Sequence, residues 1–150
     1  MIGGGGAGGG NNYGACDHYG GNSGFWIIKH PYTVTPSTEY DVVVGAGGTA
    51  PAHAGNGGAG GDTSFDSITV LGGTGGIGFA TGSGAGVIPT RTPGISKTGL
   101  VTEGGSSNFG IGGIATGGYT GTAPVGYGAG GYSNDTAGLG GTQGVCIIEW

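Results

Sequence analysis

The sequence predicts an all-β fold combined with polyglycine II helices, that is, short β-hairpins beside a glycine-rich bundle of the polyproline II type, with almost no α-helix. Glycine makes up 45 of the 150 residues. Short aromatic or β-branched runs lie between the glycine-rich stretches, as is typical of strands. No stretch carries apolar residues at i, i+3, i+4 and i+7 over three turns, and glycine at this density destabilises a helix.

The glycine content demands a structural reason. Each glycine in a regular element costs about 0.5–1 kcal/mol more than alanine, because its backbone loses more freedom on folding. The two tryptophans, seven tyrosines and several aliphatic clusters indicate a chain that buries side chains rather than a disordered one. Glycine must therefore permit what alanine forbids, and close packing of backbones is the obvious candidate.

The spacing of the glycines supports this interpretation. The strict repeat of collagen is absent, but glycine recurs at every third residue in four short registers. A polyproline II helix has three residues per turn and no internal hydrogen bonds, so each register gives one face without side chains. Such faces can pack together and form hydrogen bonds between helices. The registers are Gly3/Gly6/Gly9, Gly55/Gly58/Gly61, Gly72/Gly75/Gly78 and Gly138/Gly141/Gly144.

The strand signals concentrate in the first half of the chain. Residues 25–30 and 40–44 are aromatic or β-branched and are separated by turn residues Pro36 and Ser37, which predicts a β-hairpin. Residues 64–70 predict a further strand, or two short strands that turn at Asp66-Ser67. We expect a last strand at 145–150, and Val87-Ile88 is a candidate for another. The side chains expected to be largely buried are those of Phe25, Ile27, Tyr40, Val42, Val44, Phe65, Ile68 and Val70.

These signals predict a single domain over residues 1–150, since the chain is too short for two ordinary cores. Residues 1–71 form a hairpin-rich scaffold in this prediction. Residues 72–150 form a glycine-rich loop and bundle region with few strand signals before the strand at 145–150.

Charge and motifs exclude several classes of function. The net charge is -5 and the three basic residues are scattered, so we expect no nucleic-acid partner. No apolar run approaches about 18 residues and the start lacks a charged n-region, so we expect no membrane insertion and no classical secretion. Residues 3–8 fit the dinucleotide pattern G-x-G-x-x-G, but no amphipathic helix follows to bind a pyrophosphate.

Catalytic and metal-binding patterns are equally sparse. The tripeptide Cys16-Asp17-His18 is the only local cluster of catalytic residue types, and we interpret it as a polar loop, with metal binding and catalysis as the alternatives. The carboxylates show no calcium-loop spacing. We therefore expect no enzyme activity, no cofactor and no metal. Cys16 and Cys146 are either unpaired or form a single bridge between the two ends of the chain.

Four stretches together carry a family resemblance. They are TVTPSTEYDVVVGAGG at 33–48, GGAGGDTSF at 57–65, ITVLGG at 68–73 and GVCIIEW at 144–150. They resemble the glycine-rich C-terminal receptor-binding domain of bacteriophage tail fibres and tail-fibre tip adhesins. Members of that family usually have a strand or a fibre shaft before the first glycine run, so the chain is either a fragment of a longer fibre protein or a separately made tip.

The resemblance implies a domain at the tip of the phage tail, outside the cell, that attaches the virion to its host. Its partners would be the remainder of the tail fibre and a bacterial surface receptor, either lipopolysaccharide or an outer-membrane protein. Trimers are common among fibres, so a homotrimer is one expected state, and a monomeric cap is the other.

Aromatic and amide side chains in the second half are the candidate receptor contacts, because no strand pattern there would bury them all and such groups at loop tips can stack on a sugar or an exposed porin loop. The alternative is that the tyrosines only cover the edges of the glycine bundle. Two rival functions also stay open, a filament-forming protein without a specific ligand and an ice-binding polyglycine protein. The candidate residues are Asn108, Phe109, Tyr119, Tyr127, Tyr132 and Asn134.

Overall fold

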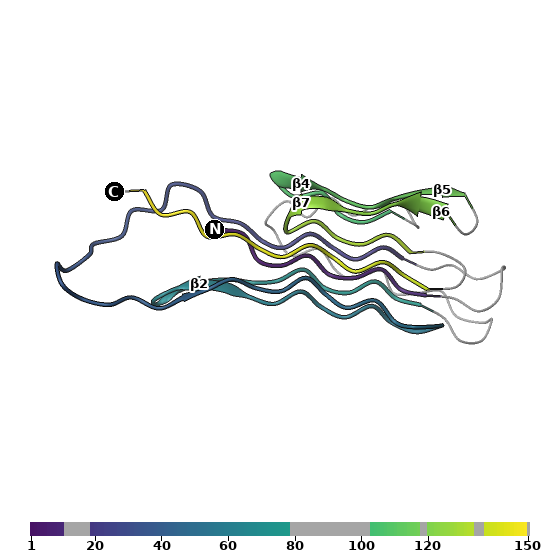
Figure 1. Ribbon diagram of the computed structural model, residues 1–150, viewed down its shortest axis with the longest axis horizontal. Helices are drawn as coiled ribbons and strands as arrows, with labels where there is room; N and C mark the ends of the chain where they lie inside the picture. Colours follow the sequence, from purple (N-terminus) through teal and green to yellow (C-terminus); the bar gives the residue numbers. More distant parts are fainter. Residues whose placement is uncertain (11–18, 79–102, 118–119, 134–136, 150) are drawn as a thin grey trace.

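The computed structural model describes residues 1–10, 19–78, 103–117, 120–133 and 137–149. These residues contain seven short strands and no α-helix, which confirms the expectation of a mainly β chain with little helix. Figure 1 shows long, wavy extended segments that run side by side, with the strands at one end and along one flank. The strands are β1 (Val42–Val43), β2 (Thr63–Phe65), β3 (Ile68–Val70), β4 (Phe109–Ile111), β5 (Ile114–Gly117), β6 (Thr120–Thr122) and β7 (Val125–Tyr127).

Three strands form an antiparallel sheet in the order β1-β2-β3. The chain turns between β2 and β3 at Asp66-Ser67, where Asp66 has a φ of 49°, a region that Asp visits more readily than most residues. The prediction of two short strands turning at this point is confirmed. Phe65 and Val70 are buried on this sheet, and the buried Thr63 hydroxyl accepts a hydrogen bond from the Gly45 N–H at 3.0 Å.

The second half of the chain contains four strands where few were expected. β4 pairs with β7, and β5 pairs with β6, both antiparallel. The prediction was wrong because glycine alternates with larger residues in β4 and β7, and glycine was read as a sign of loops. In a two-residue period, that alternation gives a strand with one bare face and one face of side chains.

The predicted hairpin between residues 25–30 and 40–44 does not form. Trp26 makes an isolated bridge to Ile2, and β1 pairs with β2 instead. The turn itself is present, because Thr38 N–H donates to the Thr35 carbonyl and Ser37 has a φ of 65°.

Two further strand predictions have different outcomes. At 145–150 only Val145 is paired, through a bridge to Ile2, so that strand was also wrong over the described residues 145–149. Val87-Ile88 lies outside the described residues.

The expected core was only partly correct. Phe65 and Val70 are buried, and Phe25, Ile27, Tyr40 and Ile68 are half-buried. Val42 and Val44 are exposed, because they lie in and directly after the edge strand β1 and no described element covers them. The centre of the molecule is instead residues 2–10, which are all buried.

The backbone of residues 2–10 is hydrogen-bonded in a three-residue rhythm. Ile2, Gly5 and Gly8 donate to the carbonyls of residues 145, 142 and 139. Gly3, Gly6 and Gly9 donate to residues 25, 22 and 19, and Gly4, Ala7 and Gly10 donate to residues 61, 58 and 55, all at 2.7–3.1 Å. Each third residue therefore meets the same neighbouring segment, and all three of these neighbours run antiparallel to it.

Three more segments donate to the carbonyls of the central one. Gly73 and Gly76 donate to Gly4 and Ala7, Gly48 donates to Gly5, and Gly131 donates to Gly6. The central segment thus has six neighbours, which are residues 19–25, 71–78, 55–61, 45–49, 139–145 and 128–133 in order around it.

These six segments form a closed ring. Every adjacent pair in the ring is joined by its own antiparallel backbone hydrogen bonds, for example Asn22 N–H to the Thr74 carbonyl and Gly144 N–H to the Gly45 carbonyl. Since strand direction alternates around the ring, the central segment is parallel to three neighbours and antiparallel to three. The N–H groups of residues 2–10 bind the antiparallel neighbours, and the carbonyls of residues 4–7 bind the parallel ones.

The glycine registers line the contacts between these segments. A Cβ added to Gly3, Gly6 or Gly9 would lie within 2.6 Å of backbone atoms of residues 71, 74 or 77. One added to Gly138, Gly141 or Gly144 would lie within 2.2 Å of a carbonyl oxygen of the central segment. In three of the four registers the three-residue spacing therefore marks faces where backbones approach too closely for any side chain, whereas a Cβ on Gly55, Gly58 or Gly61 would have no neighbour closer than 3.0 Å.

Candidate binding surface

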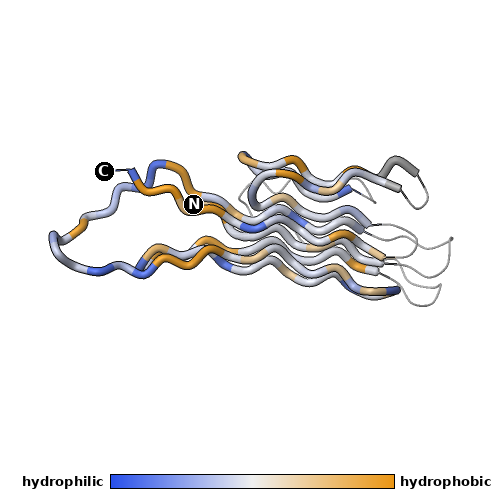
Figure 2. The backbone as a smooth tube through the Cα atoms, in the orientation of Figure 1, coloured by the Kyte–Doolittle hydropathy of each residue, from blue (hydrophilic) through white to orange (hydrophobic). Residues whose placement is uncertain are grey.

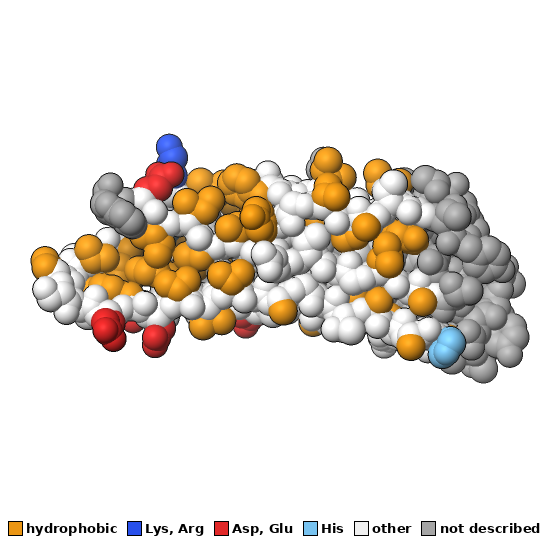
Figure 3. Space-filling view, in the orientation of Figure 1, with side chains coloured by type: hydrophobic (Ala, Val, Ile, Leu, Met, Phe, Trp, Pro, Cys, Tyr) orange, Lys and Arg blue, Asp and Glu red, His pale blue; other side chains and the backbone are white. Residues whose placement is uncertain are grey.

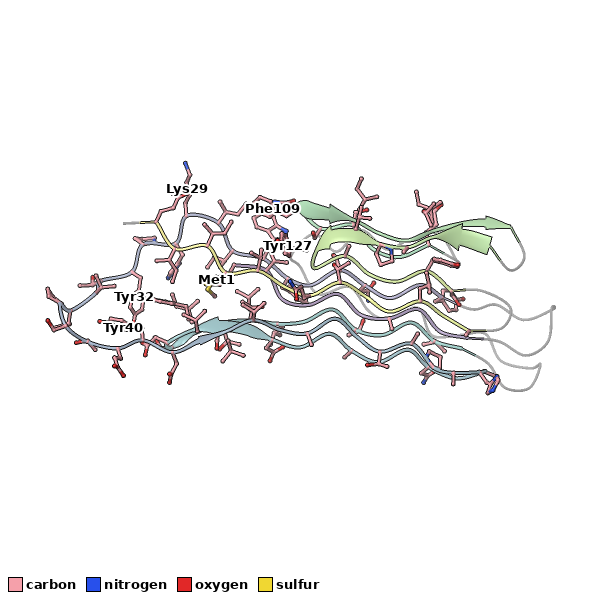
Figure 4. The ribbon with its side chains drawn as sticks, viewed as in Figure 1. Met1, Lys29, Tyr32, Tyr40, Phe109 and Tyr127 are labelled. Atoms are coloured by element: carbon pink, nitrogen blue, oxygen red, sulfur yellow. The ribbon has the colours of Figure 1, made fainter. Side chains whose placement is uncertain are left out.

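The sheet of β4 and β7 presents a row of exposed apolar side chains on one flank of the bundle. Phe109 lies across from Tyr127, and Ile111 lies across from Val125. Phe109 and Ile111 are two apart on β4 and therefore share a face of that strand, whereas Gly126, between Val125 and Tyr127, has a φ of 84°. All four are more than 40% exposed. Figure 4 shows Phe109 and Tyr127 next to one another at one end of the two strands.

Glycine determines which way this face points. Gly110 and Gly126 are paired between the two rows of side chains. A Cβ on Gly110 would lie 2.7 Å from the Tyr127 carbonyl oxygen and 3.0 Å from the Ala129 Cβ, so only glycine fits on the inner side. Gly110 thus lies against the bundle, while the four large side chains of the two strands are exposed.

A serine fixes the end of the sheet. The Ser107 hydroxyl donates to the Tyr127 carbonyl and accepts from the Phe109 N–H at 3.2 Å. The Ser107 N–H donates to the Gly110 carbonyl at 2.9 Å. Asn108 lies at this turn, directly before Phe109, and is exposed.

Three of the six predicted contact residues, Asn108, Phe109 and Tyr127, thus come together at one end of β4 and β7. Tyr132 does not, because it is only 5% exposed and its ring approaches Gly113 and Gly121. Its expected position at a loop tip was wrong, and it is a packing residue beneath the flank. Tyr119 and Asn134 lie outside the described residues.

Ile111 and Val125 also belong to this surface but were not among the predicted contact residues. The signal that would have found them is the alternation Phe109-Gly110-Ile111-Gly112 and Val125-Gly126-Tyr127-Gly128. The surface is also free of formal charge, because residues 104–133 contain no Asp, Glu, Lys or Arg. A ligand here would be held by apolar contact, ring stacking and neutral hydrogen bonds.

A second aromatic cluster lies in the first half of the chain, around the loop that precedes β1. The Tyr32 ring meets Tyr40 and Phe65 edge-on, with centroids 5.9 and 5.2 Å away, and Tyr40 stacks on Phe65 at 5.7 Å. The Tyr40 hydroxyl accepts from the Thr35 N–H at 2.7 Å. The three rings pack against one another, so we interpret this cluster as the anchor of the loop.

An acidic residue completes this anchor. The Tyr32 hydroxyl donates to the Asp66 carboxylate, which lowers the pKa of Asp66 below its ordinary value and raises the pKa of Tyr32 above its own. Both shifts favour the pair in which Tyr32 is protonated and Asp66 is ionised.

The remaining sequence motifs have definite positions. Each N–H of residues 3–8 donates to a protein carbonyl, so the G-x-G-x-x-G pattern has no free donors for a phosphate. Within the described part of the chain, no three His, Cys, Asp or Glu side chains group together, and no helix is long and apolar enough to span a membrane. Cys146 is half-buried and unpaired, and Cys16-Asp17-His18 lies outside the described residues.

Fold and surface together define a mainly β domain built on glycine-mediated backbone contacts. The family model described as a glycine-rich domain matches residues 1–118, and the chain belongs to this family. The match includes the central segment and four of its six neighbours, while residues 128–133 and 139–145 lie beyond it. No curated protein matches the chain.

Proposed function

We propose that this glycine-rich domain is the tip of a bacteriophage tail fibre and binds a host bacterial surface receptor, either lipopolysaccharide or an outer-membrane protein. The observation that carries the proposal is the uncharged face of β4 and β7, where Phe109, Ile111, Val125 and Tyr127 are exposed on a sheet held against the bundle. Exposed apolar patches of this kind often mark interaction sites. The sequence resemblance to tail-fibre tips supplies the biological setting.

The proposed scaffold for this surface is a polyglycine II bundle. Its support is the three-residue rhythm of hydrogen bonds between the central segment and its ring, together with glycine at the close contacts. A crystal structure in which residues 2–10 have φ near −75° and ψ near +145° would agree with it, and β-strand geometry would not.

A rigid scaffold suits recognition because little conformational entropy is lost when the ligand binds. The rings of Phe109 and Tyr127 offer flat faces for stacking, and the Asn108 amide offers both a donor and an acceptor. Tyr119 and Asn134 remain proposed contacts, and Tyr132 acts only by supporting the flank. We propose no catalytic activity and no nucleic-acid partner. The proposed location is on the virion, outside the cell.

Binding of the labelled chain to host bacteria tests this proposal with a matched pair of variants. Val125 and Val43 are both exposed strand valines, at 57% and 54%. We expect Val125→Asp to reduce cell binding at least about tenfold, because a carboxylate must then be desolvated at the contact. Val43→Asp, with the same chemistry on another surface, should leave binding and melting temperature unchanged.

Binding to mutant host strains identifies the class of receptor. Loss of binding on cells with truncated lipopolysaccharide indicates a glycan, and loss on cells without the major porins indicates a protein. If the wild-type chain binds no strain that the parent phage infects, or if Val125→Asp binds as wild type does, the β4–β7 surface is not the receptor site.

A filament-forming protein is the second candidate, and one observation favours it. The outer edge of β1 is unpaired, and such edges can join chains. Electron microscopy of the purified chain separates the two candidates, since continuous filaments support assembly and discrete particles support a tip.

A further inference from the structure

The surface of β4 and β7 lacks the charged groups that an anionic ligand requires. Residues 104–133 contain no Asp, Glu, Lys or Arg, and the whole chain carries a net charge of -5. Lys29 is the only Lys or Arg among the described residues, and it lies beyond the end of β4 and β7, towards the C-terminus (Figure 4). The phosphates and acidic sugars of lipopolysaccharide would therefore meet no positive charge on these strands, and the net charge of the chain would repel them.

The serine hydroxyls beside this surface are used by the protein itself. The Ser107 hydroxyl is bonded to the backbone at the ends of β4 and β7, and the Ser106 hydroxyl accepts from the Gly112 N–H at 3.0 Å. Among the described side chains of this surface, the Asn108 amide and the Tyr127 hydroxyl are left to bond a ligand. A neutral sugar carries several hydroxyl groups on each ring, and two side chains can bind only a few of them.

Branched aliphatic side chains lie next to the two aromatic rings. Ile111 and Val125 are 60% and 57% exposed, more than Phe109 and Tyr127 at 49% and 42%. An aromatic ring can stack on a sugar, but an aliphatic side chain offers neither a flat face nor a hydrogen bond. A sugar hydroxyl placed against Ile111 or Val125 loses its water without gaining a partner, which is unfavourable. Apolar side chains of a polypeptide carry no such penalty and gain from the burial of apolar area.

The apolar surface continues beyond the two strands, because Ile114 of β5 is also 41% exposed. In the space-filling view, hydrophobic side chains lie over this flank, whereas the acidic and basic side chains gather at the end that carries the termini (Figure 3). The colouring by hydropathy shows hydrophobic stretches along the same strands (Figure 2). Five such residues expose roughly 400 Å², the size of the largest apolar patch on a typical monomer. This is about half of the ~800 Å² that one partner contributes to a standard protein interface.

We infer that the receptor bound at this surface is a protein, which presents an uncharged polypeptide segment with aromatic or aliphatic side chains, and not lipopolysaccharide. The inference rests on the proposed function, because it takes the β4–β7 surface as the receptor site. The exposed apolar side chains of the two strands contact those of the segment. The Asn108 amide and the Tyr127 hydroxyl are available to its backbone amides, which both donate and accept hydrogen bonds.

Exchange of valine for threonine distinguishes the two classes of ligand, because it replaces a methyl group by a hydroxyl at nearly the same shape. For an apolar polypeptide, Val125→Thr should weaken binding to host cells about three- to tenfold, since the hydroxyl loses its water without a partner. For a glycan the new hydroxyl gains a partner, so unchanged or stronger binding overturns the inference. Val43→Thr, at a strand valine of nearly equal exposure on another surface, is the matched control and should bind as the wild type does.

Competition identifies the receptor directly. Host outer-membrane proteins, extracted in detergent and freed of lipopolysaccharide, should inhibit binding of the wild-type chain to cells. The same proteins should inhibit the residual binding of Val125→Thr less strongly, in proportion to its weaker affinity. Purified lipopolysaccharide of the host strain should not inhibit. Inhibition by lipopolysaccharide, or none by the protein fraction, overturns the inference.

Ionic strength provides an independent measurement. Because no formal charge lies on β4 or β7, raising sodium chloride from about 50 mM to about 500 mM should change the Kd for host cells by less than about twofold. A weakening of about tenfold or more would reveal an ionic contact and contradict the uncharged ligand.

Failure of the inference and failure of the proposed function are distinguishable. A wild-type chain that binds no host cells refutes the proposed function. A chain that binds cells, loses binding in Val125→Asp and is inhibited by lipopolysaccharide supports the proposed function and refutes the protein receptor alone.

Discussion

The packing of this structure depends on the absence of a Cβ atom at the glycines between neighbouring segments. At most glycines of the bundle, a Cβ would lie about 2 Å from a backbone oxygen of the next segment, as at Gly5 and the Ala129 carbonyl. A backbone, unlike a side chain, cannot rotate away, so the two segments would have to separate. Alanine is therefore excluded at these positions by the hydrogen bonds that hold the segments together.

Not every glycine of a register is equally constrained, and Gly75 and Gly58 show this. A Cβ on Gly75 would lie 1.9 Å from the Gly57 carbonyl oxygen, whereas one on Gly58 has no neighbour closer than 3.1 Å. We expect Gly75→Ala to destabilise the fold by about 3 kcal/mol or more. Gly58→Ala should cost no more than about 1 kcal/mol. Urea denaturation measures both, and equal effects would contradict close packing as the role of Gly75.

Replacing each of two buried serines with alanine should change the stability of the fold in opposite directions. The Ser23 hydroxyl is buried without a hydrogen-bond partner, whereas the Ser133 hydroxyl donates to the Gly9 carbonyl. Since an unpaired buried hydroxyl is unfavourable, Ser23→Ala should raise stability by about 1 kcal/mol. Ser133→Ala should lower it by about the same amount. Thermal melts of the two variants provide the check, and a loss of stability in Ser23→Ala would indicate a partner for that hydroxyl.

The tyrosines divide into packing and surface residues. Tyr132 is 5% exposed, whereas Tyr127 is 42% exposed. Tyr132→Ala should lower the free energy of unfolding by about 3–5 kcal/mol, as is usual for a buried aromatic residue. Tyr127→Ala should lower it by no more than about 1 kcal/mol and should affect cell binding instead. A stable Tyr132→Ala variant would mean that the flank does not depend on this ring.

At the scale of the elements, glycine has two different periods in this chain. In the bundle it recurs every third residue and bares one face of an extended segment. In β4 and β7 it recurs every second residue and bares one face of a strand. The same residue thus gives backbone contact in both elements, and the period decides which neighbours are contacted.

The hairpin predicted before β1 failed for a reason that lies outside its own sequence. Residues 25–27 pair with the N-terminal residues instead. Met1 and Ile27 exchange two backbone hydrogen bonds. β1 likewise pairs with β2, although residues 25–30 are nearer to β1 in the sequence. Local strand propensity was correct for β1, but the choice of partner is a tertiary matter.

The stability that the loop in place of the predicted hairpin contributes should depend on pH in the acid range. Because the pKa of Asp66 is lowered in the folded chain, its carboxylate adds stability above the ordinary carboxyl pKa, about 4, and this contribution is lost as the pH falls through the lowered value. Tyr32, whose pKa is raised, contributes below about pH 10 and loses its effect only above that. We therefore expect the melting temperature to fall on acidification below about pH 4.

The control for this acid response is Asp66→Asn, which tolerates the positive φ but cannot ionise. Its melting temperature should depend less on pH in the acid range than that of the wild type. Identical acid profiles would show that other carboxyl groups dominate the response.

At the scale of the whole molecule, the ring makes folding cooperative. Residues 2–10 are joined to all six neighbours, and each neighbour is joined to the next. The partners of the central segment come from positions as distant as 145, so its hydrogen bonds form only when most of the chain is in place. A β-sheet gives each strand at most two neighbours, whereas this arrangement gives the central segment six.

Hydrogen exchange measures this organisation. The amides of residues 3–10 are buried and bonded on every side, so they should exchange more slowly than any others in the chain. The amides of residues 28–41, which are mostly exposed, should exchange fastest within the first half. Early exchange in residues 3–10 would contradict the central position of this segment.

Much of the architecture follows from the sequence alone. The absence of helix from the described residues follows from glycine density, three of the four glycine registers mark close backbone contacts, and the turn at Asp66-Ser67 was correctly located. Each of these features depends on residues near one another in the chain or on the steric property of a single residue. Such features can be read without knowing which segments meet.

Tertiary structure alone decided which segments are neighbours and which side chains are covered. Extended glycine segments resemble one another, so nothing local distinguishes residues 19–25 from 139–145 as partners of the centre. The closed ring selects them, because it gives every N–H of residues 2–10 a carbonyl partner. For the same reason Val42 is exposed and Tyr132 is buried, against their sequence-based prediction. Burial depends on what lies above a residue, and here that is backbone from distant parts of the chain.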